Sequence, residues 1–212
     1  MLSLETARPW YPAQDPVHGF DHVERVYRMV ERLALAEGAD LEIVRAAALL
    51  HDASGSHPAG ETGRESHQHA SADFARQVLQ AEGWSEGRIR AVLHCIRAHR
   101  FRDESEQPQT LEAKVLFDAD KLDAIGATGV ARAIGYNVQA GQAAYSPPSP
   151  RFLQTGEKEA GEDHSAYHEY LYKLVRLKDL LHTPTARHIA ERRHRTLVEY
   201  FEALRAEASG DA

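Results

Sequence analysis

Residues 41–52 constrain the fold more than any other part of the sequence, because the helix that they would form is apolar on almost every side. The apolar side chains in this stretch are Ile43, Val44, Ala47, Ala48, Leu49 and Leu50. A helix that is apolar all round is normally buried, for example at the centre of a bundle. We therefore expect this segment to be a central helix on which the others pack.

The three- and four-residue spacing of amphipathic helices recurs along the rest of the chain. A helix is expected from Asp21, a candidate N-cap, to Gly38, a candidate stop. Further helices are expected at about 67–82, 86–99, 110–123, 124–138, 163–181 and 185–207. The alternation typical of strands is nearly absent. The sequence thus predicts an all-α protein, organised as a single-domain helical bundle.

Proline and glycine mark the boundaries within this expected domain. Residues 1–20 are rich in proline and aromatic residues and are predicted to be an irregular lead-in. Residues 21–138 would form the helical core, and the proline- and glycine-rich stretch 139–162 is predicted to be a long surface loop. Loops of this length are often functional. The helices of residues 163–212 would pack on the same domain.

Composition and charge narrow the functional classes. The 212 residues carry a formal net charge of −7, which argues against general nucleic-acid binding. A small phosphorylated substrate is compatible with this charge, because a divalent cation can reverse the sign of a pocket locally. We expect neither a membrane span nor a signal sequence. Cys95 is the only cysteine, so a cytoplasmic location is expected.

Histidine and aspartate side chains fall where the helical pattern places buried residues. His22 precedes Val23 near the start of one helix, and His51 and Asp52 end the most apolar helix. Three more carboxylates interrupt the apolar stretch AKVLFDADKLDAIGA, namely Asp118, Asp120 and Asp123. Burying an unpaired carboxylate is costly, and one divalent ion could compensate several of them together.

Each of these residues also has an ordinary structural interpretation. A single histidine on an apolar face is more often a hydrogen-bonded core residue than a metal ligand. A His-Asp pair at a helix end could be a cap, and the DADKLD run could be a partly solvated face beside Lys121. Only the joint occurrence of the motifs favours a metal site.

In its order of motifs, the sequence resembles the HD-domain metal-dependent phosphohydrolases, a superfamily of helical proteins with the signature His…His-Asp…Asp. His22 matches the first histidine, His51 and Asp52 match the doublet, and Asp120 matches the last aspartate. The match extends over about residues 18–135. The resemblance implies that these four residues bind a divalent metal ion, with Mn, Fe, Co, Ni, Zn or Mg as candidates, and that Asp123 orients ligands or an interior arginine.

The same resemblance suggests further site residues. His67 and His99 lie between the doublet and Asp120, where superfamily members with two metals place additional histidines. They are candidates for a second metal site or for phosphate binding. Lys121 and Arg25 are candidate phosphate contacts, with ion pairs as the alternative. Three other expected roles concern the reaction and its surroundings. Asp52 is a candidate proton acceptor and Glu61 or Glu65 a candidate general acid, while His18 could line the site or fix the N-terminal segment.

Three functional classes remain open at this point. The first is hydrolysis of a phosphoester or phosphoanhydride in a small molecule such as a nucleotide, by metal-activated water. The second is a di-iron oxygenase of the HD type, for which His67 and His99 would complete six ligands. The third is a metal-binding module without catalysis. His164 and His168, spaced i,i+4, could also bind a metal, but the acidic residues around them favour a solvated helix start.

Overall fold

The computed structural model describes residues 2–11, 19–53, 67–100 and 106–211. Its contacts separate two compact units. Unit 1 comprises Met1–Asp120 with Leu181–Ala186, and unit 2 comprises Lys121–Leu180 with Arg187–Ala212. The sequence gives no sign of this boundary, because it falls inside one continuous helix, α7 (Leu111–Asp123).

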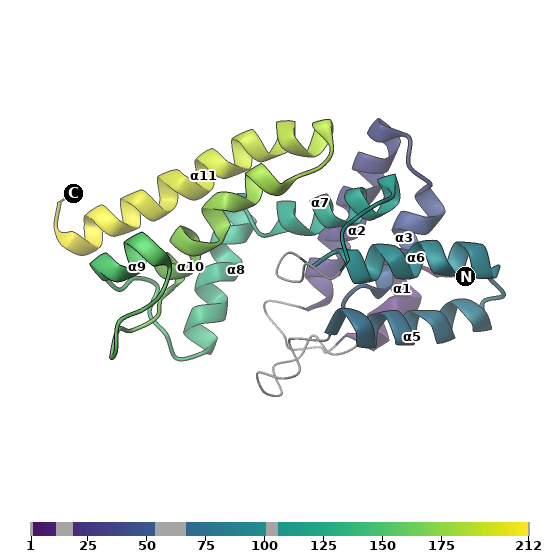
Figure 1. Cartoon of the computed structure of the whole chain (residues 1–212), viewed down its shortest axis with the longest axis horizontal. Helices are drawn as coiled ribbons and strands as arrows, with labels where there is room; N and C mark the ends of the chain where they lie inside the picture. Colours follow the sequence, from purple (N-terminus) through teal and green to yellow (C-terminus); the bar gives the residue numbers. More distant parts are fainter. Residues whose placement is uncertain (1, 12–18, 54–66, 101–105, 212) are drawn as a thin grey trace. The chain divides into compact units, whose positions relative to one another are not determined.

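Unit 1 is built around helix α3 (Leu41–Leu50), which packs against α2, α5, α6 and the short helix α1 (Figure 1). These neighbours span Phe20–Glu37 (α2), His67–Ala81 (α5), Glu86–Ala98 (α6) and Leu4–Ala7 (α1). Seven of the ten residues of α3 are buried. The predicted central helix is thus confirmed, and its C-terminal end lies inside the unit.

Capping residues define where α2 and α3 begin. Asp40 starts α3, since its carboxylate accepts hydrogen bonds from the backbone amides of Glu42 at 2.9 Å and Ile43 at 3.2 Å. Helix α2 has Gly19 as its N-cap, so the assignment of Asp21 as the cap is wrong. Asp21 lies in the first turn instead, where its charge complements the helix dipole. Gly38 ends α2 in the left-handed conformation, as expected.

The N-terminal lead-in is more regular than the sequence predicts. Helix α1 begins with a capping box between Ser3 and Thr6, and a 3₁₀ turn, η1 (Arg8–Trp10), follows the helix. Trp10 packs edge-on against Phe74 of α5, with 5.4 Å between ring centroids. The prolines suggested an irregular segment, but Pro9 is tolerated in the first turn of the 3₁₀ helix.

Unit 2 contains helices α8 (Gly126–Gln139), α9 (Pro150–Thr155) and α10 (Ala166–Tyr172), the 3₁₀ segment η2 (Leu174–Leu180) and most of α11 (Pro184–Ser209). Its core includes Tyr170 of α10 stacked on Phe201 of α11, with centroids 4.7 Å apart. Helix α8 packs against α10.

Two predicted boundaries in this part of the chain are wrong. The predicted loop 139–162 contains α9, because Ser149 caps the helix, Pro150 occupies its first turn and Gly156 ends it. The predicted helix 163–181 is divided into α10 and η2, since Lys173 leaves the helical conformation.

The all-α class is confirmed for the described residues, where the only β-type pairing is an isolated bridge between Ala143 and Ser165. Within the same residues, none of the helices has the length and apolar character needed to cross a membrane.

Candidate metal centre

His51 and Asp52 directly follow the buried helix α3. The His51 ring is fully buried, and its Nδ1–H donates to the backbone carbonyl of Ala48 at 2.9 Å. A carbonyl oxygen can only accept, so the proton of this imidazole resides on Nδ1. Its Nε2 is thereby left as the lone-pair nitrogen, which is the form that binds metals.

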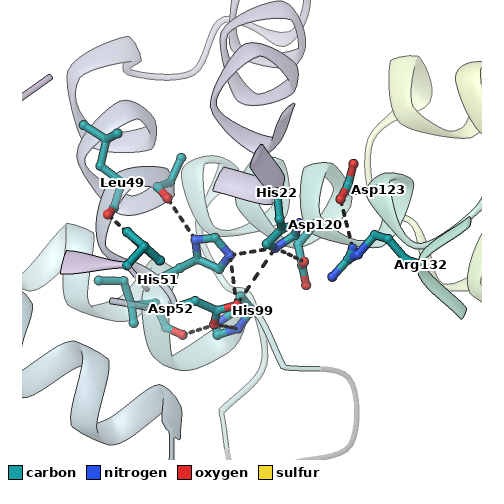
Figure 2. A network of polar contacts seen from close by, with 11 residues as sticks. His22, Leu49, His51, Asp52, His99, Asp120, Asp123 and Arg132 are labelled. Carbon is teal, nitrogen blue, oxygen red and sulfur yellow. Dashed lines mark hydrogen bonds and ion pairs between the residues drawn. The ribbon is translucent and has the colours of Figure 1, made fainter. Parts of the chain in front are cut away.

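His22, from the first turn of α2, presents a second imidazole to the same point. It is 1% exposed, and its Nε2 lies 3.3 Å from Nε2 of His51 (Figure 2). Two imidazole nitrogens held this close need either a shared proton or a common cation between them.

Two carboxylates complete the cluster. Oδ2 of Asp52 lies 3.6 Å from Nε2 of His51 and 3.9 Å from Nε2 of His22. Oδ1 of Asp120, from α7, lies 3.5 Å from Nε2 of His22. Figure 2 shows these side chains converging from α2, from α7 and from the turn after α3. The predicted residues His22, His51, Asp52 and Asp120 are thus brought together in unit 1.

His99 adds a third imidazole at the end of α6 and repeats the arrangement of His51. It is buried, and its Nδ1–H donates to the carbonyl of Ile96, three residues earlier, at 2.5 Å. Its Nε2 lies 3.6 Å from Oδ1 of Asp52. Asp52 therefore faces His22 and His51 with one oxygen and His99 with the other.

This donor set is suitable for a divalent ion. Donor atoms about 2.1 Å from a common ion are separated by roughly 3.0–3.5 Å in octahedral or tetrahedral geometry. The four donor pairs measured among His22, His51, Asp52 and Asp120, at 3.3 to 3.9 Å, are close to that range. His22, His51 and Asp52 each offer a ligand atom, and these atoms all lie within 4.8 Å of one another. Mixed imidazole and carboxylate ligands favour borderline first-row ions.

The other acidic residues of α7 have protein partners of their own. Asp118 is buried and accepts hydrogen bonds from the amides of His182 at 2.8 Å and Thr183 at 2.7 Å. Burial raises the pKa of its carboxyl, although the hydrogen bonds from this segment oppose the increase. Asp118 therefore anchors residues 181–186 within unit 1. In unit 2, Asp123 forms an ion pair with Arg132 at 2.9 Å, which corresponds to the interior-arginine alternative.

The remaining candidates are less clearly connected to the cluster. Arg25 forms an i,i+4 ion pair with Asp21 at 2.5 Å, and Lys121 is buried. His18, Glu61 and Glu65 lie outside the described residues. The side chain of His67, the first residue of α5, does so as well. The roles of these residues stay predictions.

Two histidines outside the cluster have both ring nitrogens occupied. His94 pairs through Nδ1 with Glu106 at 2.7 Å, and its Nε2 accepts the amide of Gln109 at 3.0 Å. His168 is fully buried, with Nδ1 at 2.8 Å from the Ser165 hydroxyl and Nε2 at 3.1 Å from Glu162. The solvated helix start expected around His168 is therefore wrong. The acidic residue that suggested exposure, Glu162, is the hydrogen-bond partner of this buried ring.

Tyr11 was not expected from the sequence to lie near the cluster. It is buried in an apolar group with Phe20, Val23 and Leu49, and its hydroxyl donates to the carbonyl of Leu49 at 2.9 Å. Burial raises the pKa of this phenol well above its usual value, and the charge of Asp52 raises it further. The only sequence signal was an aromatic residue in a segment that was expected to be irregular.

Comparison with known proteins places this cluster in a family. The sequence profile of the HD domain matches residues 19–125, which include all four of the converging signature residues and His99. The chain belongs to the HD domain family. The resemblance seen in the order of the motifs is thereby confirmed.

Similar proteins match over almost the full length of the chain. The uncharacterized protein YpgQ of Bacillus subtilis (strain 168) is 32% identical over 217 residues, covering 99% of this chain and 96% of YpgQ. The crystal structure of YpgQ in complex with ADP superposes with a TM-score of 0.73 at 30% identity, covering 99% of this chain and 100% of that one.

Two further solved structures show the same architecture. A protein from Lactobacillus plantarum has a TM-score of 0.78 at 29% identity, with 100% of both chains covered. An HD-superfamily hydrolase from Bacillus thuringiensis has a TM-score of 0.69 at 28% identity, covering 97% of this chain and 94% of that one. The chain is thus a member of the HD-superfamily hydrolases, with a His/Asp cluster that could hold a metal ion.

Proposed function

We propose that the chain is a metal-dependent phosphohydrolase that cleaves a phosphoester or phosphoanhydride of a nucleotide. The observation that carries the proposal is the convergence of two Nε2 atoms and two carboxylates at one buried point, with donor separations of 3.3 to 3.9 Å. The hydrogen bond from His51 to Ala48 adds to this, because it directs the lone pair of Nε2 toward the cluster.

His22, His51, Asp52 and Asp120 would hold the ion. A divalent ion bound there supplies an activated water and neutralises charge on the phosphoryl oxygens. Attack by a water activated at such an ion would need no nucleophile from the chain itself. Oδ1 of Asp52, on the side of His99, can accept the proton of the attacking water.

The proposed substrate class is supported by a relative. YpgQ has been crystallised with ADP, and it matches this chain over 99% of its length. A nucleotide carries a phosphoryl group on which such a site can act. Its base would bind outside the metal cluster. A net charge of −7 is compatible with this substrate once a cation is bound.

His99 gives one specific reason to consider the second candidate, a di-iron oxygenase. Its Nε2 lies 3.6 Å from the second oxygen of Asp52, so these two atoms would be donors for a second ion. The same position also suits a phosphate-binding imidazole in a hydrolase with one metal. The metal content of the protein and the oxygen dependence of turnover distinguish a di-iron oxygenase from a hydrolase with one metal.

The test is a screen of chelator-treated protein under anaerobic conditions. Nucleoside mono-, di- and triphosphates are supplied with Mn²⁺, Co²⁺, Ni²⁺ or Mg²⁺, and released phosphate and pyrophosphate are measured. We expect metal-stimulated release that is lost in His51→Ala and Asp52→Ala but kept in His94→Gln, whose nitrogens bind only protein groups. Turnover that requires oxygen, or that survives both cluster variants, would contradict the proposal.

A further inference from the structure

The C-terminal end of α3 leaves backbone carbonyls without helical partners, as every helix end does. In a continuing helix, the amide of Ala53 would reach the carbonyl of Leu49. Here it donates to Leu50 instead, at 3.3 Å. Leu49 is fully buried, so its carbonyl needs a donor from within the protein.

Two side chains supply the donors at this end of α3. The His51 ring serves the carbonyl of Ala48 at 2.9 Å. The hydroxyl of Tyr11 serves the carbonyl of Leu49, also at 2.9 Å, across 38 residues of sequence. The last turn of α3, from which the His-Asp doublet extends, is therefore held by one of its own candidate ligands and by the segment before α2.

The surroundings of Tyr11 fix the direction of its hydroxyl. The ring is 6% exposed and packs against Phe20, with 5.6 Å between centroids, as well as against Val23 and Leu49. Burial and the nearby charge of Asp52 raise the pKa of the phenol, whereas a hydrogen bond with the backbone of Asp52 lowers it. The group thus stays neutral near pH 7 and keeps the proton that it donates.

We infer that Tyr11 is a positioning residue for the metal centre, fixing the end of α3 so that His51 and Asp52 meet His22 and Asp120. It is not a ligand, and the inference rests on the metal site of the proposed function. Tyr11 also lies outside residues 19–125, which match the HD domain. The accuracy of the site would then depend on an N-terminal segment beyond the domain that carries the ligands.

The test is Tyr11→Phe, which keeps the ring and its packing but removes the donor. Mn²⁺ affinity is measured by calorimetry on metal-free protein, together with the thermal midpoint. Losing a group that orients a ligand typically weakens metal binding about 10- to 100-fold, and we expect a loss in this range. The matched control is Tyr27→Phe, because Tyr27 packs against the same apolar group from α2. We expect it to leave the affinity unchanged.

A second variant separates positioning from packing. Replacing Tyr11 with p-aminophenylalanine restores an N–H donor on the same ring, and we expect it to recover most of the affinity. Equal affinity in wild type, Tyr11→Phe and Tyr27→Phe would overturn the inference, as would a failure of the amino variant to recover binding.

The outcome for the proposed function is read separately in the same protein. Wild type that binds Mn²⁺ but hydrolyses no nucleotide would contradict the phosphohydrolase proposal and leave the role of Tyr11 standing. Wild type that binds no Mn²⁺ would overturn both.

Discussion

His51 in unit 1 and His168 in unit 2 are both fully buried imidazoles, yet their surroundings suit them to different tasks. His168 has a protein partner on each ring nitrogen, Ser165 on Nδ1 and Glu162 on Nε2. His51 gives only Nδ1 to a backbone carbonyl and turns Nε2 toward other metal-binding groups. Burial alone therefore does not distinguish a structural histidine from a ligand; the number of ring nitrogens that the fold itself satisfies does.

His99 extends the comparison within unit 1. Like His51, it follows the last residue of a helix and returns its Nδ1–H to the carbonyl three residues earlier. This arrangement satisfies an orphan carbonyl of the helix end and aims Nε2 away from the helix. A histidine directly after an apolar helix thus serves both as a C-terminal cap and as an oriented ligand.

The largest effect is expected for His51→Ala, which removes a nitrogen that no other residue replaces. Both Mn²⁺ affinity and metal-dependent turnover should fall by more than about 100-fold, because loss of a ligand exceeds the usual loss from its supporting shell. Calorimetry and phosphate release measure the two effects. If His168→Ala, corrected for its folded fraction, lost as much metal affinity as His51→Ala, the two histidines would not differ in function as their surroundings indicate.

His99→Ala should have an intermediate effect. We expect turnover to fall about 10- to 100-fold, the scale seen when a group that orients a ligand or transfers a proton is lost, while the first Mn²⁺ ion still binds. Metal analysis by mass spectrometry then separates the two possible roles of His99. Loss of one of two bound ions would assign it as a ligand of a second metal, and an unchanged single ion would assign it to the substrate. Unchanged turnover would contradict any role in the site.

His168→Ala should change stability instead of chemistry. Removing the ring takes the imidazole partner from the buried Ser165 hydroxyl, which typically costs about 1–3 kcal/mol, and removes one of the several hydrogen bonds of Glu162. Urea denaturation should show this loss, with metal affinity of the folded protein unchanged. Full stability in this variant would mean that the hydrogen bonds of His168 contribute little to unit 2.

Glu162 is expected to affect stability mainly in acid, so a change of this residue should have the smallest effect of the series near neutral pH. Burial raises the pKa of its carboxyl, but hydrogen bonds from Ser149, the amide of Glu159 and the His168 ring outweigh it and lower the pKa to about 2, from 4.5. A carboxyl whose pKa is lower in the folded state than in the unfolded chain stabilises the protein at pH values above its unfolded-state pKa. This contribution is lost as the pH falls from about 4.5 to about 2.

Glu162→Gln is the corresponding variant. Because glutamine does not titrate, it should flatten the part of the acid-stability profile that Glu162 contributes. Thermal midpoints measured from pH 6 to pH 2 give the comparison. Identical slopes in wild type and variant would show that this carboxylate does not set the acid sensitivity of unit 2.

The sequence predicted most of the long helices, and the buried polar residues on them, because both depend on local patterns. The apolar pattern of α3 identifies the buried helix, and His51 and Asp52 follow it directly. His22 and Asp120 likewise interrupt apolar helical patterns. The order of motifs in the HD-domain superfamily then indicated that His22, the His51-Asp52 doublet and Asp120 belong to one site, which their local patterns do not show.

Contacts between distant residues could not be predicted in this way. The hydrogen bond from Tyr11 to Leu49 joins residues 38 positions apart, and nothing in the local pattern of either residue indicates it. His168 looked exposed because acidic residues surround it, although Glu162 is its partner. Helix α9 was missed because proline and glycine also mark the ends of short helices.

Anomalous diffraction can show directly whether the His/Asp cluster of unit 1 binds a divalent ion. Crystals grown with Mn²⁺ would be measured on both sides of the manganese absorption edge. We expect an anomalous peak about 2.0–2.3 Å from Nε2 of His22, Nε2 of His51 and an oxygen each of Asp52 and Asp120. Manganese peaks elsewhere, with none at this cluster, would contradict it.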